Sequence, residues 1–175
     1  QALPDRMIAR LRHLLRDRRG VASVEFALMT PIIFALMFTA FEGGHYLWTE
    51  HKVIKGVRQG ARYAARLPFA SYDCSTTTPT GTTAIPLDNI KNVVRTGIPS
   101  GQAFPKVKGW TNGDITITVS CNSSFDKGLY SNTTGGAPRV LVSTVVTYPA
   151  ILGLLGFDTS NVKVRAQAQA AVAGV

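Results

Sequence analysis

A single carboxylate interrupts the longest apolar stretch of the chain. The stretch runs from Val21 to Phe41, and Glu25 is its only charged residue. Full immersion of a carboxylate in a bilayer costs on the order of 2 to 3 kcal/mol, so an acid at this position is expected to have a specific role. Gly20, directly before the stretch, is a small residue suited to proteolytic cleavage. The junction therefore joins a residue that is compatible with cleavage to a carboxylate whose position needs a specific reason.

No enzymatic motif accompanies this junction. The sequence lacks Gly-x-Ser-x-Gly, His-Glu-x-x-His, Gly-x-x-x-x-Gly-Lys and nucleotide-binding patterns. His45 and His51 flank the end of the apolar stretch and are predicted to be passive surface groups, and the aspartates of the later chain show no paired spacing. We therefore predict a protein that is not an enzyme and that has no catalytic residue, metal or cofactor.

The distribution of charge predicts a membrane topology. The chain has a net charge of +9, and its first 20 residues carry six arginines against two aspartates, a net charge of +4. By the positive-inside rule this end stays in the cytoplasm and the rest is exported. The remaining lysines and arginines are dispersed without interleaved aromatic residues, so no nucleic acid partner is expected.

The apolar stretch is long enough to cross a bilayer. As a helix, residues 21–41 extend about 30 Å, which is the thickness of a bilayer core. A cleaved secretory signal is the alternative, but its apolar region is shorter, about 7 to 15 residues, and ends in a small-residue cleavage site. Here the helical pattern continues through Glu42 instead. We therefore predict a transmembrane segment at 21–41 within one helix over 21–67, ended by Pro68.

The second half of this helix is predicted to be amphipathic. Apolar residues recur there near a 3.6-residue period, and basic residues fall three or four apart on another side. This basic stripe consists of Lys52, Lys55, Arg58, Arg62 and Arg66. It is either a solvated helix face or a docking surface for acidic head groups or a neighbouring subunit.

The remaining residues, 68–175, predict one head domain of mixed α+β class. A short helix is expected over 87–95, with Asp88 able to cap it and Gly97 ending it. Three later segments alternate apolar and polar residues and predict an antiparallel meander with one partly wet face: 114–121, 139–148 and 162–172. The second is β-branched throughout and is expected to be central.

Cys74 and Cys121 are the only cysteines, and both are on the exported side of the predicted topology. An oxidising compartment favours a disulfide between them. Zinc is the alternative, but two sulfurs without a nearby histidine fall short of the usual four ligands.

An apolar connection at 149–157 separates the last two predicted strands. It is too short to cross a bilayer. It either folds under the sheet as a satellite core or contacts the membrane or a partner. The candidate contact residues are Ile151, Leu152, Leu154, Leu155 and Phe157.

The chain resembles the TadE-like pilus-assembly proteins of the tight-adherence (Tad/Flp) branch of type IV pili. The resemblance is strongest over 18–67 and rests on three motifs: Arg19-Gly20 followed by Val-Ala-Ser-Val-Glu25-Phe26, then Phe41-Glu42-Gly-Gly, then Gly60-Ala-Arg62-Tyr63-Ala-Ala65. In place of Glu42-Gly43-Gly44, relatives often have an aromatic and a basic residue.

This resemblance implies a pilin-like pseudopilin or minor pilin whose leader, 1–20, is cut after Gly20 by a prepilin peptidase, so that the mature chain begins at Val21. Glu25 and Phe26 are then implied in peptidase recognition and subunit register. The implied location is the bacterial inner membrane, single-pass, with the head in the periplasm or incorporated into the pilus. The implied partners are the peptidase, the other minor pilins and the major pilin, the inner-membrane assembly platform and the lipid bilayer.

Two alternatives accompany this reading. Glu25 next to a new α-ammonium on Val21 would gain several kcal/mol of attraction before desolvation in a partly dry site. It could instead be a first-turn acid favoured by the helix dipole, worth about 0.3 to 1 kcal/mol. The whole chain could likewise be an unprocessed, signal-anchored binding domain of adhesin-like or envelope-sensing type.

Overall fold

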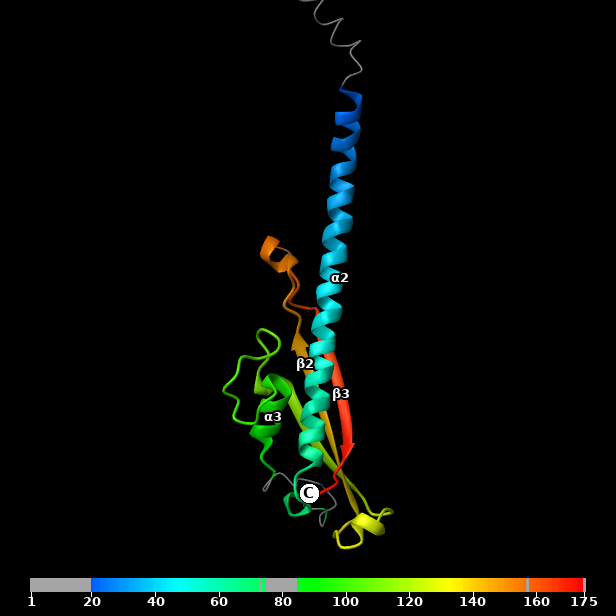
Figure 1. Cartoon of the computed structure of the whole chain (residues 1–175), viewed down its shortest axis with the longest axis vertical. Helices are drawn as coiled ribbons and strands as arrows, with labels where there is room; N and C mark the ends of the chain where they lie inside the picture. Colours follow the sequence, from blue (N-terminus) through cyan, green and yellow to red (C-terminus); the bar gives the residue numbers. More distant parts are fainter. Residues whose placement is uncertain (1–19, 73, 75–84, 157, 175) are drawn as a thin grey trace, which may run out of the picture. The chain divides into compact units, whose positions relative to one another are not determined.

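The computed structural model describes residues 20–72, 74, 85–156 and 158–174, whose helices and strands are drawn in Figure 1. The predicted leader, apart from Gly20, lies outside the described residues. The chain combines a long helix α2, a shorter helix α3 and a three-stranded antiparallel sheet, which confirms the α+β prediction. It divides into two compact units, the first ending at Phe41 and the second running from Glu42 to Val175.

Helix α2, Val21–Ala65, has two kinds of surface. Its residues up to Phe41 are exposed with the one exception of Thr30, which is half-buried. From Thr49 onward it buries one face, as the amphipathic pattern predicted, and the members of that face are Thr49, Val53, Gly56, Val57, Gly60, Ala61 and Ala64. The helix ends two residues earlier than predicted, in a tight turn in which Leu67 N–H donates to the Ala64 carbonyl at 3.0 Å.

The sheet is the predicted meander. Its strands are β1 (Ile115–Asn122), β2 (Ala137–Thr147) and β3 (Lys163–Ala171), in the order β1-β2-β3 with both pairs antiparallel. The buried face of β2 consists of Val140, Val142, Thr144 and Val146. The basic and amide side chains of β3 are exposed on the other face, so one side of the sheet is wet.

Helix α3, Leu87–Thr96, confirms the predicted short helix but not its cap. Pro86 occupies the N-cap position and no side chain caps the helix. The prediction that Asp88 caps the helix was wrong, because Asp88 lies inside the first turn. Its exposed carboxylate there interacts favourably with the helix dipole instead. The helix ends at Gly97 as predicted, with φ of 97° in the left-handed region that glycine adopts without strain.

One hydrophobic core joins α2, α3 and the buried face of the sheet. Trp110 lies within it with 1 % of its surface exposed. Its indole N–H donates to Thr144 Oγ1 at 3.1 Å, and the Thr144 hydroxyl in turn donates to the Asp114 carbonyl at 2.7 Å. Both polar groups are therefore satisfied inside the core, which removes the cost of burying them.

The contact between α2 and the rest of the core depends on two glycines. A Cβ added to Gly56 would lie 2.5 Å from the Val94 carbonyl oxygen and 2.8 Å from the Trp110 ring. A Cβ added to Gly60 would overlap the Val94 side chain. Only glycine lets α2 approach α3 this closely at these two positions.

Cys74 and Cys121 are joined in the structure, with their Cα atoms 5.7 Å apart and 47 positions of sequence between them. The bond links the segment after α2 to the end of strand β1. Closing a loop of this length would stabilise the head by roughly 4 kcal/mol in the chain-entropy model.

We expect Gly56→Ala to lower the free energy of unfolding by about 1 to 3 kcal/mol, because the added methyl overpacks the core against Val94 and Trp110. Gly44→Ala is the matched control in the same helix, since a Cβ there meets nothing within 4 Å. It should raise stability by up to about 1 kcal/mol through helix propensity. Denaturant unfolding of the full chain in detergent measures both, and equal effects would contradict the close packing.

We expect the double variant Cys74→Ser, Cys121→Ser to lower the free energy of unfolding by roughly 4 kcal/mol. Reduction of the native chain should produce a loss of similar size, seen as a lower denaturation midpoint. A metal chelator should leave the midpoint unchanged. A chelator effect without a reductant effect would favour the zinc alternative.

Candidate functional site

The start of α2 places Glu25 beyond the first helical turn. Gly20 is exposed, the helix begins at Val21, and Val24 N–H donates to the Gly20 carbonyl at 3.1 Å. The first turn contains no acidic residue. Because the helix dipole acts mainly within that turn, it gives Glu25 little stabilisation. The neighbouring Phe26 side chain is exposed as well.

The apolar half of α2 is suited to anchor the chain in a membrane. It is long and apolar enough to cross one, and none of its most apolar window is buried. Its threonine hydroxyls form hydrogen bonds within the helix. Thr30 donates to the Phe26 carbonyl at 2.6 Å, and Thr39 donates to the Ala35 carbonyl at 2.8 Å. Such internal pairing is what a helix in hydrocarbon requires of its hydroxyl groups.

A polar cluster follows directly after this apolar half. We define the helix–loop cluster as Glu42, His45, Tyr148 and Leu152. Glu42 Oε2 accepts a hydrogen bond from Leu152 N–H at 3.0 Å. The Tyr148 hydroxyl donates to the Glu42 carbonyl at 3.2 Å and lies 2.8 Å from His45 Nδ1. The cluster thereby ties the 149–157 connection to α2.

The residues of the helix–loop cluster are partly shielded from solvent: Tyr148 is buried, and the other three are half-buried. Burial raises the pKa of Tyr148 well above its ordinary value, and the Glu42 carboxylate adds to the effect. Glu42 Oε1 is buried without a hydrogen-bond partner in the part of the chain that the structure describes. His45 is half-buried and bonded rather than a passive surface group, so that expectation was wrong for His45, whereas His51 is exposed.

The apolar connection is held at α2 by the hydrogen bond between Leu152 N–H and Glu42. It contains a short 3-10 helix, η4 (Leu152–Leu155). Ile151 is 45 % exposed and Leu152 is half-buried. Phe157 and the side chains of Leu154 and Leu155 lie outside the described residues. At Ile151 the connection therefore presents an apolar side chain to solvent.

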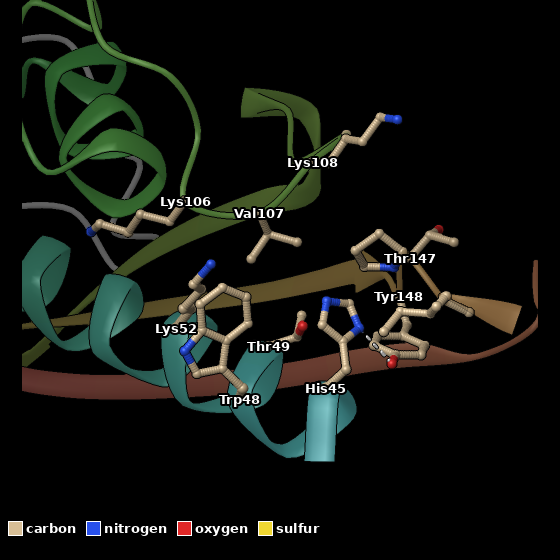
Figure 2. Close-up of a pocket in the computed structure, with 13 residues that line it drawn as sticks. His45, Trp48, Thr49, Lys52, Lys106, Val107, Lys108, Thr147 and Tyr148 are labelled. Atoms are coloured by element: carbon tan, nitrogen blue, oxygen red, sulfur yellow. Dashed lines mark hydrogen bonds between the residues drawn. The ribbon is translucent and has the colours of Figure 1, made fainter. Parts of the chain in front are cut away.

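A pocket of about 630 Å³ opens next to the cluster. We call it the helix–loop pocket. Three segments far apart in sequence line it: α2, the stretch before β1 and the stretch after β2 (Figure 2). Its principal side chains are His45, Trp48, Lys52, Lys108, Tyr148 and Ile151. No aspartate or glutamate is among its lining residues.

The three lysines around the pocket differ in what they bind. Lys52 Nζ lies 3.1 Å from the centre of the Trp48 ring, a cation–π contact. Lys106 points its ammonium away from His45 and Tyr148 in Figure 2. It donates to Gln59 Oε1 at 2.6 Å and to the Val94 carbonyl at 3.2 Å, and burial lowers its pKa. Lys108 is exposed.

Metal ions in proteins are held by groups of His, Cys, Asp and Glu side chains. Among residues 20–72, 74, 85–156 and 158–174, no group of three or more His, Cys, Asp or Glu side chains could hold a metal ion. The site instead consists of apolar and aromatic surface with unpaired basic groups. Such a surface binds other molecules by packing and charge.

Sequence reasoning found some of these residues but not their association. Gly20, Glu25, the cysteine pair and the 149–157 connection were identified from local patterns. The helix–loop cluster and pocket were missed, because their members are up to 110 positions apart. The spacing of Trp48 and Lys52, one turn apart on a helix, was the one local signal available.

Comparison with known proteins agrees with the sequence motifs. The family model described as TadE-like protein matches residues 20–62. No curated protein and no solved structure matches the chain. The matched segment starts at the glycine before α2, includes Glu25 and Glu42, and ends at Arg62, one residue after the buried Ala61. Over this segment the chain is similar to the TadE-like family, as its sequence motifs predicted.

Proposed function

We propose that this chain is a non-enzymatic pseudopilin or minor pilin of the tight-adherence pilus system. The TadE-like match indicates an association with the Tad pilus. The finer proposal depends on one observation. Glu25 is the sole charged residue in the exposed apolar half of α2, residues 21–41, and it follows Gly20 by five positions. In this proposal residues 21–41 anchor the chain in the inner membrane and 68–175 form a periplasmic head.

The leader is removed after Gly20 in this proposal. Gly20 is exposed, and a Cβ added there would meet nothing within 4 Å, so the peptide bond to Val21 is unobstructed by the described residues. The basic leader keeps this bond near the cytoplasmic face, where a membrane-bound prepilin peptidase acts.

Cleavage gives Glu25 its partner. The new α-ammonium of Val21 and the carboxylate of Glu25 have opposite charges about one helical turn apart. Within one chain they neutralise each other. Between neighbouring helices the same pair fixes the axial register of two subunits, because a shifted register leaves both charges unpaired in lipid.

The head contributes by packing against other subunits in this proposal. Its partners are the other minor pilins, the major pilin and the assembly platform. The wet face of the sheet and the basic stripe of α2 are the surfaces available for such contacts, because Lys55, Arg58 and Arg62 are all exposed.

We expect mass spectrometry of the chain from pilus-producing cells to show an N-terminus at Val21. Gly20→Val should retain the leader, because a branched side chain blocks the peptidase while leaving the described fold unobstructed. Gly43→Val is the matched control, since a Cβ there also meets nothing within 4 Å, and it should still be cleaved. A retained leader in native, pilus-producing cells would support the unprocessed binding domain instead.

We expect Glu25→Gln to reduce surface pili by at least about tenfold, because removing one partner of a poorly solvated ion pair destabilises by several kcal/mol. Glu50→Gln makes the same change on the same helix outside the apolar segment and should leave pili unchanged. Counting filaments by electron microscopy measures both. Normal filaments in Glu25→Gln would exclude a register-setting role.

A further inference from the structure

We propose that the helix–loop pocket binds the head group of an anionic phospholipid. The inference rests on the membrane anchoring proposed above and adds a ligand to it. The ligand chemistry is a phosphate monoanion with apolar chains attached, and the lipid is its source. Three observations carry the inference: the position of the pocket along α2, its charge, and its apolar rim.

The position of the pocket matches the depth of lipid head groups. His45 and Trp48 follow Phe41, the last residue of the apolar stretch, by four and seven positions. At 1.5 Å per residue this is about 6 and about 10 Å of helix. The head-group layer of one leaflet is about 5 to 8 Å thick, so His45 falls within it and Trp48 lies at its outer edge. The Lys52 ammonium is at the level of Trp48, because it contacts the Trp48 ring. Trp48 is 55 % exposed, and exposed tryptophans concentrate at this depth.

The charge of the pocket suits a phosphate. Within the described part of the chain, the ammonium groups of Lys52 and Lys108 make no hydrogen bond or ion pair with a carboxylate, and the pocket lining includes no acid. Lys106 is not available, because Gln59 and carbonyl groups of α3 hold its ammonium. Each lysine near an anionic surface strengthens binding by about fivefold.

The Glu42 carboxylate does not oppose this charge from within the pocket. Glu42 is not among the lining residues, and its Oε2 is engaged by Leu152 N–H. The same bond holds the connection after β2 against α2 and so fixes one wall of the pocket. Tyr148 and His45 complete that wall with polar atoms, which are hydrogen-bonded at 2.8 Å. Figure 2 marks this bond with a dashed line.

The rim of the pocket is apolar on the connection side. Ile151 is 45 % exposed and lines the pocket, and Pro149 and Ala150 precede it. An acidic peptide would match the lysines but would leave this apolar surface in water. A phospholipid matches both, because its acyl chains cover apolar surface while its phosphate meets the lysines.

The experiment uses the full chain in phosphatidylcholine nanodiscs that contain a small fraction of nitroxide-labelled lipid, either phosphatidylglycerol or phosphatidylcholine. The nitroxide is near the top of an acyl chain, where it quenches nearby tryptophan. The chain has two tryptophans, and Trp110 is buried in the core, so Trp48 reports contact. The readout is the ratio of quenching by the anionic lipid to quenching by the zwitterionic lipid.

We expect a ratio of at least about 5 for the native chain and a drop of about fivefold in Lys52→Gln and in Lys108→Gln. Lys127→Gln is the matched control. Lys127 is exposed in the connection before β2. The pocket residue Tyr148 follows the opposite end of this 11-residue strand, so Lys127 lies outside the pocket. This control should keep the native ratio. Millimolar inorganic phosphate should also leave the ratio unchanged, because a lipid-held phosphate has the higher local concentration.

Three results would overturn the inference: a native ratio near 1, an equal loss in Lys127→Gln, or loss of the ratio in inorganic phosphate. Near-ultraviolet circular dichroism identifies any variant that fails to fold, and Lys108→Gln, an exposed loop change, keeps the test decisive if Lys52→Gln is unstable. Co-elution of the chain with nanodiscs is scored separately. Failure to insert contradicts the proposed anchoring, whereas an inserted chain without lipid preference contradicts this inference alone.

Discussion

The head is organised around the close approach of α2 to α3. Gly56 and Gly60 remove the side chains that would hold the two helices apart, and Val94 and Trp110 occupy the space. Trp110 can be fully buried only because Thr144, on the central strand, accepts its indole N–H. One contact thus connects the long helix, the short helix and the sheet, and the core closes around it. A methyl group at either glycine position would separate these elements.

The second constraint is that α2 serves two environments. Up to Phe41 it exposes apolar side chains, and from Thr49 it buries one face in a protein core. The residues between must satisfy polar groups at the boundary. Glu42 does so by accepting the Leu152 N–H, which also holds an apolar connection in place. In this chain Glu42 therefore has a structural role.

These features support a protein that acts by position and packing. A carboxylate at Glu25 fits a charged partner inside lipid, and the unpaired lysines of the helix–loop pocket fit phosphate at the lipid surface. The two sites are 20 or more residues apart on one helix, so they fall at opposite ends of the apolar segment. Together they would fix both the depth of the subunit in the membrane and its register against a neighbour.

Local patterns in the sequence determined the elements: the two-part helix, the three strands and their order, and the Gly20 and Glu25 junction. Hydrophobic periodicity specifies these because it depends on residues within a few positions of each other. It failed for Asp88, because a cap depends on which residue begins the helix, not on composition nearby. Only the tertiary structure brought His45 and Tyr148 together across 103 positions and formed the pocket beside them. Periodicity identifies which face of each element is buried, but the pairing of faces is decided by packing of the whole chain.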